Sequence, residues 1–234
     1  MRINNNQNNP SFKTRFEFIN PERFRQLLLD NPEAVEVSNS LFGDYKEIWD
    51  GGCIFTEGIG SCTAYGLTLK GTKEAFLGHY NRSARELTDF IDIERIEKEE
   101  DPNKKNRLKQ FIEDFISKAR GFIIGGDRDG GMHEFFERDV KKFRKAKIPT
   151  TIFWGQRIRS SDVLVDADKD ICYICKNMEA PYEDAIMPFY KFAETPEQIK
   201  EAYHIIHVEK GDEVWVNGQR IDSELLNQND EKYC

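Results

Sequence analysis

Hydrophobic and polar residues alternate in short runs along most of the chain, which is typical of half-buried β-strands. The stretch TAYGLTLKGTKEAFLGHY alternates on both sides of Lys70-Gly71-Thr72 and predicts a hairpin. Other strands or hairpins are predicted at residues 43–49, 52–55, 121–126, 148–155, 162–175 and 212–221. Apolar residues recur at helical spacing at residues 21–30, 83–90, 105–119, 132–147 and 195–206, which predicts helices there.

The order of these elements indicates how the chain is organised. A strand, a helix and a second strand follow one another between residues 121 and 155, which favours a mixed core of helices and sheet. The polar start MRINNNQNNP and the helix at 21–30 are expected to form an N-terminal extension, residues 1–42. A change of texture after Asn177 predicts a C-terminal extension, residues 177–234, with a helix and a hairpin. Residues 43–176 then form the core.

Charge and composition narrow the class of partner. The 234 residues carry a formal charge of −8, which disfavours binding to nucleic acid or to an anionic membrane. No apolar run reaches the roughly 18 residues of a membrane-spanning helix, so we expect no membrane insertion. Five cysteines without a disulfide-like spacing, behind a polar N-terminus, indicate free thiols in the cytoplasm. Export without a cleavable signal stays open.

Cys62 has the most suggestive surroundings of the five cysteines. It follows Gly58-Ile59-Gly60-Ser61, and glycines at alternate positions permit a tight turn that exposes backbone N–H groups beside the thiol. His79 lies across the predicted hairpin and could act as the base that a nucleophilic cysteine needs. The same spacing also fits a buried structural cysteine and a histidine at a strand end.

The remaining cysteine and histidine pairs favour structural roles. Cys172 and Cys175 have metal-like spacing, but a strand would direct their thiols to opposite faces and no second pair accompanies them. His204 and His207 could contribute to a mixed site only if the fold brought them to these cysteines. Cys53 is expected to pack within the strand that precedes the turn. We therefore predict no metal site.

The segment Ile54-Phe55-Thr56-Glu57-Gly58-Ile59-Gly60-Ser61-Cys62 resembles the L-x-T-x-G-L-G-S-C signature of the CheD family of chemoreceptor glutamine deamidases. The likeness spans about residues 43–176. It implies an α+β fold with a mixed sheet or β-sandwich core flanked by helices. A similar Cys-His core occurs in toxins of the cytotoxic necrotizing factor type.

The resemblance also implies a triad in which Cys62 is the nucleophile, His79 the base and Thr56 the residue that orients His79. Gly60 and Ser61 would belong to the turn that stabilises the oxyanion. The implied reaction converts a protein glutamine to glutamate and requires no cofactor. On this basis we expect the pKa of Cys62 to lie below that of a free cysteine, through pairing with His79.

The chain departs from the family pattern near the last strands. Gly155-Gln156 and Ser160-Ser161 stand where the family usually has Gly-Gly and Gly-Arg, and GDRDGGMH lacks the usual Arg-Asn. These differences affect the region expected to dock a substrate protein. Two alternatives to the deamidase therefore stay open: a peptide or ester hydrolase with the same Cys-His dyad, and an inactive protein-binding module.

Overall fold

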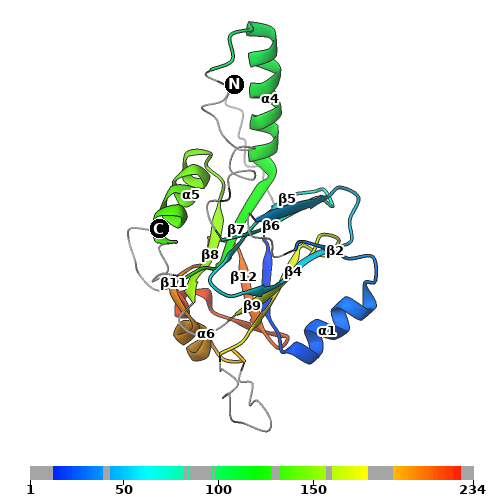
Figure 1. Cartoon of the computed structure of the whole chain (residues 1–234), viewed down its shortest axis with the longest axis vertical. Coiled ribbons are helices and arrows are strands. Elements are labelled where there is room, and N and C mark those ends of the chain that lie inside the picture. The colour runs from blue at the N-terminus through cyan, green and yellow to red at the C-terminus, as the bar shows by residue number, and fades with distance from the viewer. Residues whose placement is uncertain are drawn as a thin grey trace, which may run out of the picture.

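Two β-sheets face each other across a common hydrophobic core (Figure 1). The computed structural model describes residues 13–38, 43–81, 84, 96, 98–127, 132–156, 160–178 and 192–227. The seven-stranded sheet has the order β13 (Gln219–Ile221), β12 (Glu213–Val216), β1 (Arg15–Phe18), β10 (Ile171–Lys176), β9 (Ser161–Asp166), β4 (Cys53–Ile59) and β2 (Val35–Glu36). The six-stranded sheet has the order β11 (Tyr203–His207), β8 (Thr150–Gln156), β7 (Ala119–Gly125), β5 (Thr63–Leu69), β6 (Ala75–Tyr80) and β3 (Asp44–Ile48).

Helices cover the outer faces of the two sheets and complete an α+β architecture, as predicted (Figure 1). Helix α1 (Pro21–Asp30) packs Phe24 and Leu27 on the seven-stranded sheet. Helix α5 (His133–Lys145) covers the six-stranded sheet, where Phe136 stacks on Trp154 with ring centroids 4.0 Å apart. The other described helices are α4 (Pro102–Lys118), which extends away from the sheets in Figure 1, α6 (Pro196–Ala202) and the 3-10 turn Ser223–Leu225.

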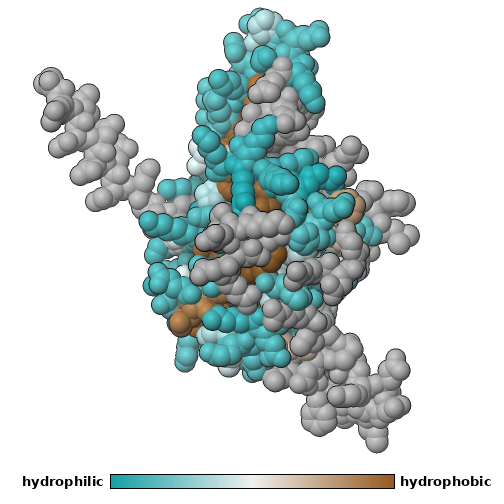
Figure 2. All heavy atoms as spheres, turned by 90° about the vertical axis from the view of Figure 1, so that its left-hand side faces the viewer, coloured by the Kyte–Doolittle hydropathy of each residue, from teal (hydrophilic) through white to brown (hydrophobic). Residues whose placement is uncertain are grey.

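Aromatic side chains fill the space between the sheets. Phe16 and Phe18 of β1 alternate with polar neighbours and face inward, as the twofold periodicity of a strand requires. Phe18 meets Phe153 of the opposite sheet at a centroid distance of 5.2 Å, and Phe16 meets Phe122 at 6.2 Å. By contrast, the face of the molecule shown in Figure 2 is mostly hydrophilic, with small apolar patches.

Most of the predicted elements are present. Helix α1 begins where Asn20 accepts the N–H of Arg23 and Pro21 occupies the first turn. The hairpins β5–β6, β9–β10 and β12–β13 form, and β7 and β8 run parallel on either side of α5. The predicted helix at 83–90 lies outside the described residues, apart from Ala84.

Two predictions about the ends of the core need correction. The helix predicted at 195–206 ends at Ala202, and Tyr203–His207 instead form β11, because they pair with β8. Strand β1 has no counterpart among the predicted elements, although it lies between β10 and β12 and pairs with both in parallel. Segments outside residues 43–176 therefore supply strands to both sheets. The division at residues 42 and 176 itself stays a prediction.

Candidate active site

Thr56, Cys62 and His79 lie on three segments that meet between the two sheets. Thr56 is in β4, Cys62 immediately precedes β5, and His79 is in β6. Ala64 pairs with His79, so Cys62, two residues earlier, is the diagonal neighbour of His79 on the same face of the sheet. That face is the inner one, because Cys62, Ala64 and Leu77 all belong to the core between the sheets.

Thr56 orients His79 by a hydrogen bond that joins the two sheets. Thr56 Oγ1 lies 2.7 Å from His79 Nδ1 and donates its own proton to the carbonyl of Val37 at 2.8 Å. Because the hydroxyl has one proton, it must accept from Nδ1–H. The other nitrogen, Nε2, is then the basic one, and it is buried without a hydrogen-bond partner among the described residues. The Thr56 role that the resemblance implied thus has a matching contact.

Burial keeps both members of the Cys-His pair neutral. Desolvation lowers the pKa of His79 from 6.5 to about 4. Burial also raises the pKa of the Cys62 thiol, and a hydrogen bond with the Ser61 side chain only partly offsets this. The expectation of a lowered Cys62 pKa is therefore wrong for this structure. The arrangement fits a thiol that transfers its proton to His79 Nε2 during attack.

The turn before Cys62 leaves two backbone N–H groups available. The pairing of β4 with β9 is interrupted between Thr56 and Ile59. Gly58 has a φ of 68°, a backbone conformation that is strained for any residue with a side chain. The N–H of Gly60 donates to the Gly58 carbonyl at 2.8 Å, so Gly60 shapes the turn and does not offer its N–H. Within the described residues, the N–H groups of Ser61 and Cys62 have no acceptor. These two groups can stabilise an oxyanion.

Gln156 fixes this turn by hydrogen bonds to its backbone carbonyls, a role that sequence patterns barely indicate. Its Nε2 donates to the carbonyls of Ile59 at 2.6 Å and Gly60 at 2.8 Å. Its Oε1 accepts from Lys176 Nζ at 2.6 Å and from Ser161 Oγ at 2.9 Å. The available signal is that Gln156 and Ser161 stand where the family pattern breaks. Lys176 carries no such signal.

The other thiols have structural surroundings. Cys172 lies in the core between the sheets, whereas Cys175 and Cys53 lie in the core under α1, so the two thiols of β10 do face opposite ways. Burial raises the pKa of Cys53 to about 11 and that of Cys175 to about 12. Among the residues whose positions are described, no group of three or more histidine, cysteine or acidic side chains could hold a metal ion.

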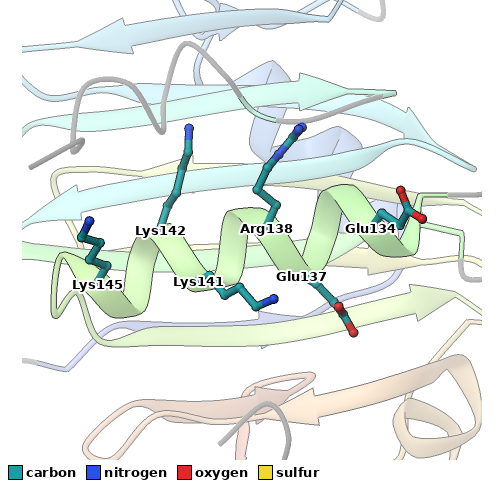
Figure 3. Close-up of a pocket in the computed structure, with 6 residues that line it drawn as sticks. All are labelled: Glu134, Glu137, Arg138, Lys141, Lys142 and Lys145. Carbon is teal, nitrogen blue, oxygen red and sulfur yellow. The ribbon is translucent and has the colours of Figure 1, made fainter. Parts of the chain in front are cut away.

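A shallow hollow of about 340 Å³ follows the outer face of α5. It is lined by charged side chains that extend from the helix: Glu134, Glu137, Arg138, Lys141, Lys142 and Lys145 (Figure 3). No triad residue lines it. We interpret it as a solvated helix surface and not as part of the candidate active site.

The comparisons with known proteins add no family assignment. No protein-family model matches the sequence, and the search of curated proteins found no match. Within the described residues, no helix is both long and apolar enough to cross a membrane. Function is therefore inferred from the geometry of Thr56, Cys62 and His79.

Proposed function

We propose that this protein is a cysteine-dependent protein-glutamine deamidase, a hydrolase that acts on a side-chain carboxamide in a target protein. The observation that carries the proposal is the Thr56–His79 bridge. Among the described residues, it leaves His79 Nε2 without a hydrogen-bond partner on the sheet face that also holds Cys62. The resemblance of residues 54–62 to the CheD signature supports a glutamine as the substrate. The five cysteines without a disulfide-like spacing support the cytoplasm as the location, with delivery into a host cell as the alternative.

The first half of the reaction forms a thioester. Cys62 Sγ attacks the carboxamide carbon of the target glutamine while His79 Nε2 takes the thiol proton. The carbonyl oxygen becomes an oxyanion, which the N–H groups of Ser61 and Cys62 stabilise. His79 then returns the proton to the amide nitrogen, the C–N bond breaks, and ammonia leaves.

The second half hydrolyses the thioester. His79 Nε2 removes a proton from water, and the resulting hydroxide attacks the thioester carbon. When this second oxyanion collapses, the C–S bond breaks and the target residue is released as glutamate. The proton on His79 returns to Cys62 Sγ, which regenerates the neutral pair. Throughout both halves Thr56 holds Nδ1–H in place, the task of the acidic residue in other triads.

A proteome comparison tests this proposal and identifies the target in the same experiment. Bacterial and host-cell lysates are incubated with the wild-type protein, with Cys62→Ala, or with Cys53→Ala as a buried-thiol control. Peptide mass spectrometry then scores glutamine-to-glutamate changes. We expect a small set of sites that the wild type and Cys53→Ala modify and Cys62→Ala does not.

Other outcomes contradict the deamidase. New chain ends that depend on Cys62 would identify a peptide hydrolase with the same dyad. Identical lysates after all three treatments would favour a protein-binding module.

A further inference from the structure

A buried polar network lies behind the turn that carries Cys62 and connects it to both sheets. Gln156 is the last residue of β8 in the six-stranded sheet, whereas Lys176 ends β10 and Ser161 begins β9 in the seven-stranded sheet. Lys176 is 1% exposed and Ser161 is fully buried. The two half-reactions use none of these three side chains, yet buried polar groups are retained only when they are well satisfied.

The polarity of the network fixes which way the Gln156 amide points. A backbone carbonyl only accepts, so the atom 2.6 Å from the Ile59 carbonyl and 2.8 Å from the Gly60 carbonyl must be the NH₂ nitrogen of Gln156. The atom 2.6 Å from Lys176 Nζ is therefore the carbonyl oxygen of Gln156. Burial lowers the pKa of Lys176 to about 7, and its amine donates to this oxygen in either protonation state. Ser161 Oγ donates to the same oxygen and also lies 3.1 Å from Tyr203 Oη. The NH₂ group of Gln156 is consequently directed at the carbonyls of Ile59 and Gly60, and each of its protons has an acceptor.

This orientation determines where the N–H of Ser61 points. In a planar trans peptide the N–H and the C=O point in opposite directions. Because Gln156 holds the Gly60 carbonyl, the N–H of Ser61 in the same peptide is directed away from Gln156. This N–H is one of the two that have no acceptor in the part of the chain that is described.

Two further hydrogen bonds and one close approach of β7 also hold this turn. Asp162 Oδ1 accepts the N–H of Gly58 at 2.8 Å, and the Cys62 carbonyl accepts the N–H of Gly126 at 2.7 Å. A Cβ atom on Gly125 would lie 2.5 Å from Ile59 Cγ2 and 3.1 Å from Gln156 Nε2, so β7 approaches the network directly. The turn is therefore held at both ends and in its middle.

We propose that Gln156, braced by Lys176, is a positioning residue that fixes the turn at Gly58–Cys62 so that the Ser61 N–H faces the reacting carbonyl. The inference rests on the proposed function for its catalytic consequence. We call the hydrogen bonds of Gln156 to the Ile59 and Gly60 carbonyls and to Lys176 the clamp. The clamp is a property of the fold that can be measured without any substrate.

The substitution Gln156→Glu tests the clamp with almost no change in shape. The carboxylate still accepts from Lys176 but cannot donate to the carbonyls of Ile59 and Gly60, which it repels. Gln198→Glu is the matched control, because Gln198 Oε1 only accepts the N–H of Glu194 at 2.9 Å, which a carboxylate can also do. Should Gln156→Glu fail to fold, Lys176→Met removes the brace and leaves the glutamine.

The first measurement is the NMR order parameter of the Ser61 and Cys62 amides in the full chain. We expect order parameters of about 0.85, typical of a rigid backbone, in the wild type and Gln198→Glu. In Gln156→Glu or Lys176→Met we expect them to fall below about 0.6. Unchanged order parameters in both Gln156→Glu and Lys176→Met overturn the clamp, whether or not the protein is a deamidase.

The second measurement is the rate of ammonia release from the target protein found in the lysate comparison. We expect Gln156→Glu to lower kcat by about 10²-fold, the usual effect of losing an oxyanion donor, with KM within about threefold of the wild type. A less stable Gln156→Glu with unchanged kcat would reduce Gln156 to a structural residue. If the order parameters change but the wild type releases no ammonia, the clamp stands and the proposed deamidase fails.

Discussion

At the scale of single residues, the site depends on where one proton is held. Thr56 has only one hydroxyl proton, and its donation to Val37 leaves Nδ1 of His79 to donate in return. Sequence resemblance supplies the three triad residues, and the structure places two of them in direct contact. The direction of the Cys62 pKa shift cannot be predicted from the sequence, because it depends on how many atoms bury the thiol.

Replacing Thr56 by Val should destabilise the fold. Valine keeps the shape but leaves both the His79 N–H and the Val37 carbonyl buried without a partner. We expect the free energy of unfolding, measured in urea, to fall by about 1–3 kcal/mol. Thr56→Ser, which keeps the hydroxyl, should cost less than Thr56→Val. A loss in Thr56→Ser as large as in Thr56→Val would contradict this, because it would mean that the methyl group contributes as much as the hydroxyl.

Acid should destabilise the protein partly through His79. Its pKa is about 4 in the folded protein and 6.5 when solvated, so between these values the unfolded chain binds the proton and the folded chain does not. Stability therefore falls as the pH falls from 6.5 to 4, by roughly 3 kcal/mol from this group.

The control for this effect is His79→Asn, which lacks the titrating group. Urea unfolding of both proteins at pH 7 and near pH 4 should show a smaller loss in the variant. Parallel losses in the two proteins would contradict a buried, neutral His79.

At the scale of elements, the turn between β4 and β5 and the glycine-containing end of β7 determine the local shape of the site. The β4–β5 turn is predictable from the spacing of Gly58 and Gly60, because a local turn is encoded by adjacent residues. Gln156 and Lys176 cannot be recognised in this way. They reach the turn only through the pairing of strands about 100 residues away in the chain.

Alanine at Gly58 and at Gly126 should have unequal effects. A Cβ atom at Gly58 meets nothing within 4 Å, so only the positive φ of 68° is strained, at about 1–2 kcal/mol. At Gly126, with a φ of 85°, the Cβ atom would lie 2.1 Å from Trp154 Nε1, and displacing Trp154 disturbs its stacking on Phe136.

Overpacking of this kind adds about 1–3 kcal/mol to the strain. Thermal or urea unfolding of the two single variants measures the difference. If Gly58→Ala destabilises the protein as much as Gly126→Ala or more, this description of the end of β7 is contradicted.

At the scale of the whole molecule, the two sheets are assembled from distant parts of the chain. The α+β class, the central hairpins and the β7–α5–β8 unit are predictable, since each has a local periodic signal. Strand β1 is not predicted, because the alternation in Arg15–Phe18 covers only four residues, which is too short a signal to identify a strand. Strand β11 resembles the end of a helix in the sequence, because Tyr203–His207 continue an apolar spacing that only pairing with β8 resolves.

The fragment 43–176 should not fold alone. It lacks β1, which separates β10 from β12, and β11, which borders β8. Without β1 and β11, Phe153 loses its ring contacts with Phe16, Phe18 and Tyr203, and both sheets are left with open edges. Circular dichroism and hydrogen exchange should show an unfolded or aggregated fragment, next to a protected full-length chain. A fragment with native-like protection would show that the end segments are true extensions.

The central claim is that Cys62 and His79 form a nucleophile and its base, and the alkylation rate of Cys62 tests it most directly. Peptide mass spectrometry of the full chain treated with iodoacetamide at pH 7 compares the wild type with His79→Asn, with Cys175 as the internal buried thiol. We predict that Cys62 reacts faster than Cys175 in the wild type and that His79→Asn slows Cys62 alone. Equal Cys62 rates in the two proteins would contradict the pair and remove the basis for a cysteine-dependent deamidase.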